Sequence, residues 1–435
     1  MDRLELARLV GGSVAALEHR DSVDYAFDPQ RVSSAATLAV MEPTGRPVLV
    51  EAAQPTDFMA ALAGAVASGD EVFLCDANWG EAERAQLNGL LQSEIINRKS
   101  EISEGWLMIP TGGTGGRLRF ARHDEDTIAA AVRGFARHFG ITRVNAAGAL
   151  PLHHVSGLMA WMRCALTSGE YRPLGWKQLE AGEMSVLPAK PDGWFFSLVP
   201  TQLERLLRRP ATVEWLRGFR TILLGGGPAW PDLLKKAADA QLPLSLSYGM
   251  TETAAMVTAL QPHEFLLGRR DSGAALPHAA VEILPDGTVR VGGYSVFHGY
   301  WPERRPERWH DTDDLGRLDE ARHLHILGRR DEVIITGGEK VNPLEVEAVL
   351  LATGEFDDVA VVGVPHPEWG SEVVAVHPAD RAPDMAVVEK AFAGLAAFKR
   401  PKRLVALPDW PRGEAGKLNR GALAELAACR VQRGG

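Results

Sequence analysis

The sequence predicts an α/β fold, in which a large amino-terminal domain of mixed and parallel sheets carries a small β subdomain and is followed by a small α+β domain. Its 435 residues are too many for one ordinary core, so two or three domains are expected. Between residues 106 and 260, short apolar segments lead repeatedly through polar or glycine-rich loops into helical segments, which is the pattern of an α/β sheet. From Ala279 the strands are short and joined by tight turns such as Pro285-Asp286-Gly287, which indicates the β subdomain.

The composition is that of a globular protein and argues against several classes. The chain is 46% hydrophobic and 24% charged, and its net charge of −9 argues against a nucleic-acid binder, which normally has a basic excess. Cys75, Cys164 and Cys429 are far apart and show no metal or disulfide spacing, so a reducing, cytoplasmic location is expected. No run of eighteen apolar residues predicts a membrane span, and residues 1–20 carry acids, unlike a signal peptide.

Apolar periodicity predicts the remaining elements in chain order. In the large domain, helices are predicted at 58–67, 81–92, 123–139 and 202–208, and strands at 71–75, 145–152, 195–199, 221–224, 242–246, 281–284, 288–291 and 324–327. A charged break at 328–332 places a boundary near 330 and divides the chain into domains 1–330 and 331–435. The second domain is predicted to contain strands at 333–335, 359–364 and 372–377, helices at 343–351 and 385–395, and a frayed tail from Arg430.

The segment from Ile109 to Arg119 has the composition of a phosphate-binding loop. Four glycines and two threonines fill positions 111–116, and two arginines follow. Glycine lets backbone N–H groups approach an anion closely, because no Cβ stands in the way. The spacing fits neither a P-loop, which needs Gly-Lys-Ser/Thr, nor a dinucleotide fingerprint, which runs directly into a helix. The alternative interpretation is a mobile surface turn.

Three further loops are expected beside this one. They are 151–157, 225–228 and 247–253, and each follows a predicted strand. Because ligands of α/β sheets collect at the carboxyl ends of strands, we expect all four loops to converge on one site.

Several residues in these loops could carry chemistry, although each has an ordinary explanation. His153-His154 is more often structural than catalytic, and no third ligand stands at zinc spacing. The 248–252 segment offers a ring, a hydroxyl and a carboxylate for a nucleotide and Mg²⁺, or forms a plain turn. The acids at 311–314 form a surface turn or bind ribose, with Arg329 as a possible partner. Without its sequence context, Lys417 would be interpreted as an ordinary solvent-exposed charge.

Taken together, these segments resemble the acyl-adenylate-forming superfamily of AMP-dependent synthetases and ligases, in order from about residue 106 to 420. Thr111–Arg119 is similar to its Thr-Ser-Gly-Thr-Thr-Gly-Lys-Pro-Lys loop, and 247–253 contains its Tyr-Gly-x-Thr-Glu signature. The segments 312–314, 328–331 and 416–417 resemble its Thr-Gly-Asp motif, its Gly-Arg hinge and its carboxy-terminal Gly-Lys. The chain departs from the pattern by having Arg119 for lysine, Leu118 for proline and Asp313 for glycine.

This resemblance implies an acid–thiol ligase with two half-reactions: a carboxylate attacks ATP to give acyl-AMP and pyrophosphate, and CoA then displaces AMP. It implies Lys417, His154 and Glu252 as catalytic residues and Mg²⁺ held by Glu252 and Thr114. The implied ATP or AMP contacts are Thr111, Gly112, Gly113, Thr114, Gly115, Gly116, Arg119, Gly225, Gly226, Gly227, Pro228, Ser247, Tyr248, Gly249, Met250, Thr251, Asp314 and Arg329. A mobile carboxy-terminal domain would rotate about Asp331 and bring Gly337, Gly338 and Glu339 to face CoA.

Within this superfamily, the short region before the glycine-rich loop and the segments 197–203, 223–229 and 247–260 resemble most the o-succinylbenzoate–CoA ligases of menaquinone biosynthesis. The second carboxylate of that acid needs a donor, for which Arg205 and Arg208 are candidates. The alternatives are a CoA ligase for another aryl or acyl acid, a stand-alone adenylating enzyme that loads a carrier protein, and a nucleotide-binding protein without turnover. Neither a nucleic acid nor a membrane is an expected partner, and a homodimer is common in the superfamily.

Overall fold

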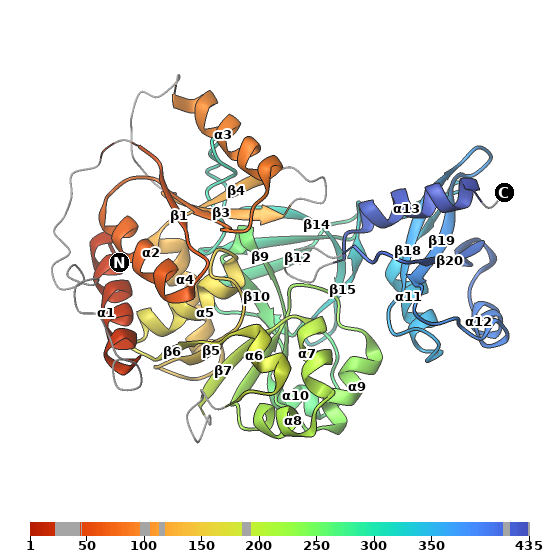
Figure 1. Ribbon diagram of the computed structural model, residues 1–435, viewed down its shortest axis with the longest axis horizontal. Coiled ribbons are helices and arrows are strands. Elements are labelled where there is room, and N and C mark those ends of the chain that lie inside the picture. The colour runs from red at the N-terminus through yellow and green to blue at the C-terminus, as the bar shows by residue number, and fades with distance from the viewer. Residues whose placement is uncertain are drawn as a thin grey trace.

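The computed structural model contains a large domain and a smaller carboxy-terminal domain, drawn at the right of Figure 1. It describes residues 1–21, 44, 46–95, 105–112, 118–184, 193–411 and 418–433. Within these ranges no helix has both the length and the hydropathy that a membrane span requires. The mixed α/β architecture confirms the fold class that the sequence predicts.

The first sheet of the large domain has four strands in the order β1-β2-β3-β4. They are β1 (Val48–Glu51), β2 (Val72–Cys75), β3 (Leu107–Gly112) and β4 (Leu118–His123). β1, β2 and β3 are parallel, whereas β3 and β4 form an antiparallel pair on the two sides of the glycine-rich loop. Helices α1 (Arg3–Asp21), α2 (Pro55–Ala67) and α3 (Glu81–Ile95) accompany this sheet (Figure 1).

The second sheet has seven strands in the order β11-β10-β9-β8-β7-β5-β6. They are β5 (Asn145–Gly148), β6 (Tyr171–Pro173), β7 (Trp194–Leu198), β8 (Thr221–Leu224), β9 (Leu244–Met250), β10 (Ala255–Ala259) and β11 (Ala274–Ala275). The strands from β5 to β9 are parallel, as the strand–loop–helix pattern predicts.

Helices cover both faces of the second sheet. Side chains alternate across each strand, so apolar residues point to both faces and both need a covering layer. Phe195 joins the core beneath α4 (Glu125–His138) and α5 (Val155–Leu166), whereas Phe196 joins the opposite core. That opposite core is built by α6 (Trp176–Ala181), α7 (Pro200–Leu207), α8 (Pro210–Arg217), α9 (Pro231–Asp239) and α10 (Pro262–Leu266).

Two predicted elements have different bounds in the structure, and the helix α5 was not predicted. The strand predicted at 145–152 ends at Gly148, and the helix predicted at 123–139 begins at Glu125 because β4 continues to His123. Asp124 caps that helix by accepting a hydrogen bond from the Thr127 N–H, 2.9 Å away. α5 was not predicted, because it is buried nearly all round and shows no polar face.

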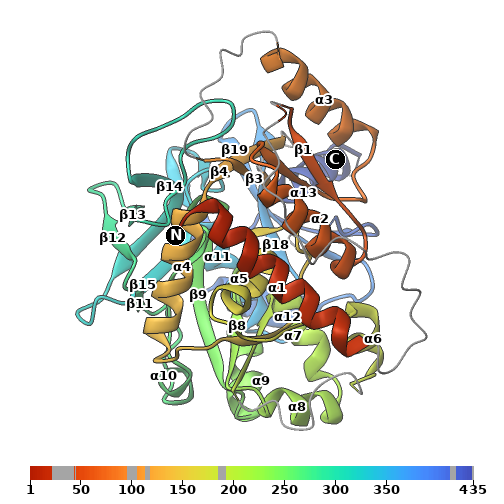
Figure 2. The same ribbon diagram turned by 90° about the vertical axis from the view of Figure 1, so that its left-hand side faces the viewer.

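The small β subdomain is an antiparallel sheet of β12 (Ala279–Ile283), β13 (Thr288–Gly293), β14 (Trp309–Leu318) and β15 (Leu324–Arg329). It stands at the left of the view in Figure 2. The three predicted strands of this subdomain are confirmed. Part of β14 was interpreted as a surface turn because three acids follow closely in its sequence; Asp311 and Asp313 are exposed in the structure, whereas Asp314 is half-buried.

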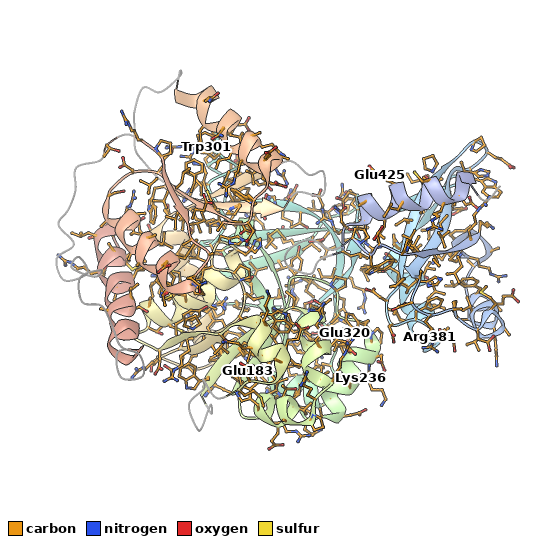
Figure 3. All side chains as sticks on the ribbon, in the orientation of Figure 1. Glu183, Lys236, Trp301, Glu320, Arg381 and Glu425 are labelled. Carbon is orange, nitrogen blue, oxygen red and sulfur yellow. The ribbon has the colours of Figure 1, made fainter. Side chains whose placement is uncertain are left out.

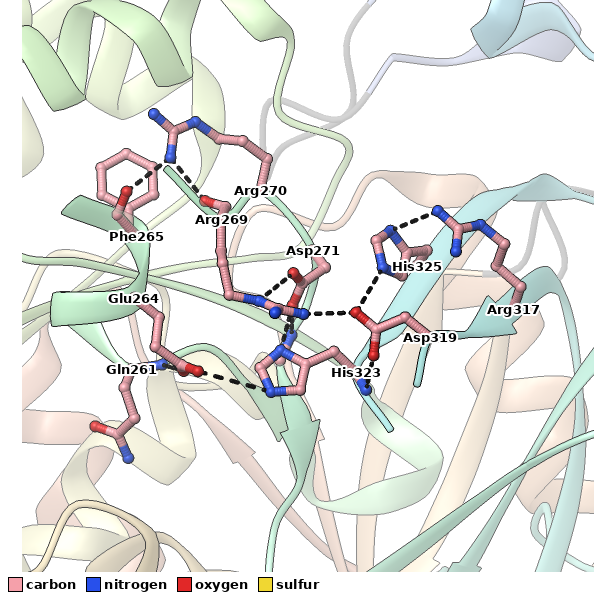
Figure 4. A network of polar contacts seen from close by, with 11 residues as sticks. Gln261, Glu264, Phe265, Arg269, Arg270, Asp271, Arg317, Asp319, His323 and His325 are labelled. Atoms are coloured by element: carbon pink, nitrogen blue, oxygen red, sulfur yellow. Dashed lines mark hydrogen bonds and ion pairs between the residues drawn. The ribbon is translucent and has the colours of Figure 1, made fainter. Parts of the chain in front are cut away.

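A polar network ties this subdomain to the loop after α10 (Figure 4). Arg269 lies between two carboxylates, with its Nε 2.9 Å from Asp271 and its Nη2 2.6 Å from Asp319. His323 Nδ1 is 2.8 Å from the other oxygen of Asp271. Asp271, Asp319 and His325 are close enough to share a cation. The Arg269 guanidinium already neutralises both acids, so we interpret the network as a structural link between the subdomain and the loop after α10.

The carboxy-terminal domain has its own sheet, in the order β17-β16-β19-β18 with β20 beside β19. Its elements are β16 (Ile334–Thr336), β17 (Glu339–Val341), α11 (Pro343–Leu351), β18 (Ala360–His366), β19 (Gly370–Pro378), α12 (Met385–Phe392), β20 (Arg403–Leu407) and α13 (Arg420–Arg433). Val361 packs with α11 and Val362 with α13, so two helical layers cover the two faces. The tail predicted to fray from Arg430 continues as helix to Arg433.

Candidate functional site

The predicted loops converge where the two large sheets meet. His153 Nε2 in the 151–157 loop is 3.2 Å from the carboxylate of Asp76, which directly follows β2. His123 Nε2, at the end of β4, is 2.7 Å from the Thr251 carbonyl oxygen. Ser247 Oγ donates to the Leu224 carbonyl, 3.2 Å away, and so holds the 225–228 loop beside the 247–253 loop. The structure therefore brings the 225–228 and 247–253 loops together as predicted, and it joins the 151–157 loop to the end of β2.

The residues predicted for adenine, ribose and the hinge form one chain of contacts. The Tyr248 hydroxyl donates to Asp314 Oδ2, 2.6 Å away, and Arg329 Nη1 is 3.5 Å from the other oxygen of Asp314. Arg329 also holds Asp331 through its Nε, at 2.8 Å. Burial and the Asp314 charge raise the pKa of Tyr248 well above its ordinary value, so its hydroxyl stays a donor. This arrangement follows from the register of β14 and β15, which pairs Asp314 with Arg329.

Gly249 is required by the packing of the nucleotide loop. A Cβ at this position would lie 2.0 Å from the Ala255 carbonyl oxygen, where no atom fits. The chain then turns sharply through the 3₁₀ helix η2 (Thr251–Thr253), and Ala254 and Ala255 have positive φ angles of 50° and 79°. The turn sends β10 back along β9 and leaves Glu252 at its apex.

Glu252 has the setting expected of a magnesium ligand. Its side chain is buried, and Tyr300 Oη donates to its Oε1 at 2.6 Å. Among the described residues, its Oε2 has no hydrogen-bond or ion-pair partner. A carboxylate with a free oxygen beside substrate phosphates is how Mg²⁺ is usually held in proteins. Tyr300 was not predicted, because it reads as one more apolar residue in the 296–301 run.

Arg119 lies next to this pair. Its guanidinium carbon is 4.3 Å from the centre of the Tyr300 ring. The other predicted residues of the glycine-rich loop, Gly113, Thr114, Gly115 and Gly116, lie outside the described residues, as does Lys417. Thr111 and Gly112 end β3 at the start of this loop.

His154 occupies the N-cap position of α5, and its ring lies 4.3 Å from that of His153. Its Nε2 is buried and has no hydrogen-bond partner in the part of the chain that the structure describes. Burial lowers the pKa of His154 and lowers the pKa of His153 to about 4. Both imidazoles are therefore neutral near pH 7, and the free nitrogen of His154 is available to a ligand.

Arg163 is a buried cation that sequence reasoning missed. It is 3% exposed, its guanidinium lies 4.2 Å from the Phe135 ring, and its Nε has no hydrogen-bond partner. No carboxylate in the described part of the chain lies within ion-pair distance of it. Burial lowers its pKa only to about 10, so it keeps its charge. The one available signal was an arginine inside the apolar α5 sequence.

His278 lies beside this buried cation. Its ring is buried, and burial, followed by the Arg163 charge, lowers the pKa of His278 to about 4, so the imidazole is neutral near pH 7. Its ring rests on α4 at Gly134, where a Cβ would lie 1.8 Å from Nδ1. Because an unpaired buried cation is costly, we interpret Arg163 and His278 as a receptor for an anionic group of a ligand.

Arg205 and Arg208, the predicted donors for a second carboxylate, do not fit that role. Both side chains are exposed, and Arg205 pairs with Glu180 across the surface at 2.9 Å. Arg205 lies on α7 and Arg208 is its C-cap; the helix turns Leu203 and Leu206 to the core and both arginines to solvent.

Gly337, Gly338 and Glu339 form the exposed hairpin turn between β16 and β17 in the carboxy-terminal domain. The two glycines have positive φ angles of 56° and 85°, which this turn requires. Their prediction as CoA-facing residues is not tested by this arrangement.

We expect the His123→Gln variant to lose less folding stability than the parent as the pH falls from 7 to 4. Burial lowers the pKa of His123 to about 4, whereas the unfolded chain has an ordinary value of about 6.5. The unfolded state therefore binds the proton first, and stability present above pH 6.5 is lost as the pH falls toward 4. Urea unfolding between pH 7 and 4 should show a smaller slope in the variant, which can still bond to Thr251. An unchanged slope would contradict the assigned burial, and His263→Gln serves as the control.

Comparison with known families decides the assignment. The model of the AMP-binding enzyme family matches residues 33–301, more than half of the chain, and that of the AMP-binding enzyme C-terminal domain matches residues 345–417. This chain belongs to the AMP-binding enzyme family. The superfamily resemblance of its motifs is thereby confirmed.

Curated relatives of this AMP-binding enzyme are named 2-succinylbenzoate–CoA ligase. The Enterococcus faecalis protein is 30% identical over 345 residues, which cover 75% of this chain and 71% of the relative. The Geobacillus kaustophilus protein is 35% identical over 300 residues, which cover 64% of this chain and 60% of the relative. The chain therefore spans 60 to 71% of the length of these two relatives.

Solved structures share the fold. The o-succinylbenzoate CoA synthetase of Bacillus subtilis, in complex with its acyl-adenylate intermediate, superposes with a TM-score of 0.73 at 22% identity, covering 97% of this chain and 92% of that one. The same B. subtilis protein has also been solved with ATP and a magnesium ion. ATP-bound MatB from Rhodopseudomonas palustris gives a TM-score of 0.76 at 23% identity, over 98% of this chain and 93% of that one.

Proposed function

We propose that this AMP-binding enzyme is an ATP-dependent acid–CoA ligase that converts 2-succinylbenzoate, CoA and ATP into the CoA thioester, AMP and pyrophosphate, as in menaquinone biosynthesis. The observation that carries the substrate is the buried Arg163 beside His278, since no carboxylate of the described residues lies within ion-pair distance of this guanidinium. An acid with one carboxylate would leave this cation without a partner, whereas an acid with a second carboxylate supplies one. The names of the curated relatives support the same substrate.

Adenylation joins two anions, so the chain must place positive charge between them. Lys417 is proposed to bridge the acid carboxylate and the α-phosphate, while Arg119 and the glycine-rich loop hold the departing phosphates. Mg²⁺ bound at Glu252 would neutralise phosphate charge. Tyr248 would border adenine, and Asp314 and Arg329 would hold the ribose.

Thioester formation needs a path for the CoA thiol that Lys417 would obstruct. Rotation of the carboxy-terminal domain about Asp331 is proposed to withdraw the lysine and present the turn 337–339 to the pantetheine arm. His154, with its free Nε2, would lie where the acyl group meets the thiol. We also propose a cytoplasmic location, consistent with free cysteine thiols, and a homodimer.

Asp331→Pro is expected to block thioester formation and spare adenylation. Proline fixes φ near −65° and prevents the backbone rotation that the second half-reaction requires. ATP–pyrophosphate exchange should stay within about threefold of the parent, while thioester release from supplied acyl-AMP falls at least tenfold, since a gating step is removed. Asp331→Ala is the control for loss of the Arg329 ion pair. An unchanged overall rate for the proline variant would disprove the hinge assignment.

The substrate is tested by ATP–pyrophosphate exchange against a panel of acids, followed by detection of the CoA thioester. The decisive pair is 2-succinylbenzoate and 4-oxo-4-phenylbutanoate, which differ only in the aryl carboxylate. Exchange and thioester formation selective for the first acid support the proposal. Equal use of both, or of simple benzoates, would point to another acid ligase. Exchange without a thioester would indicate a stand-alone adenylating enzyme, and ATP binding without exchange a nucleotide-binding protein.

A further inference from the structure

The segment 297–301 joins the two halves of the candidate site. The Phe297 N–H donates to the Glu252 carbonyl oxygen, 2.9 Å away, which fixes the nucleotide loop. The next residues run antiparallel to β4: the His298 N–H donates to the Arg122 carbonyl at 2.9 Å, and the Trp301 N–H donates to the Phe120 carbonyl at 2.8 Å. The Trp301 side chain is buried at the edge of the first sheet (Figure 3). The backbone around Tyr300 is therefore held on both sides.

Tyr300 makes two contacts of different kinds from this fixed position. Its hydroxyl donates to Glu252 Oε1 at 2.6 Å, and its ring face receives the Arg119 guanidinium at 4.3 Å. A phenolic hydroxyl next to a carboxylate donates its hydrogen to it, so the direction of this hydrogen bond is fixed. One side chain thus sets the position of both a carboxylate and a cation.

This contact is one that Arg119 makes better than the lysine of the superfamily pattern would. A guanidinium is planar and stacks on an aromatic face, and it still presents its N–H groups at the edge to phosphate oxygens. The lysine ammonium is a point charge on a flexible stem and would be held less well by the ring. The pair Arg119 and Tyr300 therefore behaves as a unit in this chain.

We propose that Tyr300 is a positioning residue that holds Glu252 in the orientation needed for the metal of MgATP and holds Arg119 against the phosphates. The inference deepens the proposed function and rests on its assignment of Glu252 and Arg119 to ATP. Glu252 has two further rotatable bonds beyond Cβ, so without the hydroxyl its carboxylate samples several orientations before ATP binds. Pre-organisation by Tyr300 removes that cost from binding.

The first test separates the hydroxyl from the ring. Tyr300→Phe keeps the ring under Arg119 and removes the hydrogen bond to Glu252. A hydrogen bond to a charged group is worth roughly a tenfold effect or more, so the Mg²⁺ concentration for half-maximal ATP–pyrophosphate exchange should rise about tenfold. At saturating Mg²⁺ the exchange rate should return to within about threefold of the parent, because the hydroxyl is assigned no part in the reaction itself. Tyr294→Phe, which alters an exposed tyrosine in the same region, is the control.

A binding measurement makes the test independent of turnover. Titration calorimetry with ATP should show about tenfold weaker binding to Tyr300→Phe when Mg²⁺ is present at a low, fixed concentration. Binding of ATP with EDTA should be unchanged, because no metal then reaches Glu252. If the parent binds MgATP but uses no acid, the proposed function fails while this comparison still decides the role of Tyr300.

The second test asks whether Arg119 and Tyr300 act together. Arg119→Lys should weaken MgATP binding about fivefold in the parent, since a stacked guanidinium is replaced by a point charge. In the Tyr300→Leu variant the same Arg119→Lys change should weaken MgATP binding less than twofold, because the aromatic ring is already absent. Equal losses in both backgrounds, or an unchanged Mg²⁺ requirement in Tyr300→Phe, would overturn the proposal. Where Tyr300→Leu fails to fold, the phenylalanine variant decides alone.

Discussion

Replacing Arg163 with methionine is expected to stabilise the protein while it abolishes use of the acid with two carboxylates. The parent buries a charged guanidinium with no carboxylate near it among the described residues. Methionine is unbranched, fills similar space beside Phe135 and carries no charge. Replacing buried ionic groups by apolar ones gains about 1–4 kcal/mol, and we expect a rise in the free energy of unfolding in urea toward the lower end of that range.

The same variant should lose about 100-fold to 1,000-fold in kcat/KM for 2-succinylbenzoate. Truncating one partner of a buried charge pair costs about 2–5 kcal/mol, because the other charge is left unpaired. The kcat/KM for 4-oxo-4-phenylbutanoate, which lacks the aryl carboxylate, should stay unchanged or rise. Arg208→Met is the matched control, because that arginine is exposed on α7. Equal losses on both acids would show that Arg163 supports the fold and does not select the substrate.

Replacing Lys417 with alanine is expected to lower the rate of acyl-adenylate formation about 1,000-fold, the upper range for removing one charge-stabilising group from a transition state. Thioester formation from supplied acyl-AMP should stay within about threefold, because the lysine is withdrawn from the site in that half-reaction. The two half-reactions are measured separately, by pyrophosphate exchange and by release of AMP from the adenylate.

Lys390→Ala is the control for that measurement, since this lysine is exposed on α12 of the same domain. Equal loss of both half-reactions in Lys417→Ala would contradict the assigned role and would indicate a general defect in the carboxy-terminal domain.

The loops of the site could be predicted because their residues are local signals. Glycines, threonines and acids follow apolar strands at 107–112, 221–224 and 244–250. The strands 221–224 and 244–250 are parallel neighbours, so their carboxyl ends lie together, whereas 107–112 belongs to the other sheet. Tyr248 and Asp314 were each predicted from a separate motif, as residues near adenine and ribose, and the structure shows that they are in contact.

Arg163 and Tyr300 could not be predicted, because their roles depend on what surrounds them. Arg163 lies in an apolar helix whose sequence has no polar face, so neither its burial nor its lack of a partner can be read from spacing. Tyr300 belongs to a segment that pairs with β4 across about 180 residues of chain. The exposure of Arg205 and Arg208 could not be predicted for a similar reason: helical spacing alone does not say which face of α7 meets the core.

The separate cores of the two domains have a consequence for how the molecule responds to damage. Among the described residues, each buried apolar cluster belongs either to the large domain or to the carboxy-terminal domain, and none contains residues of both. A cavity made at Val361 or Val374 therefore weakens only the small domain, and the molecule need not melt as one cooperative unit. The half that carries the nucleotide loop can stay folded while the other half opens.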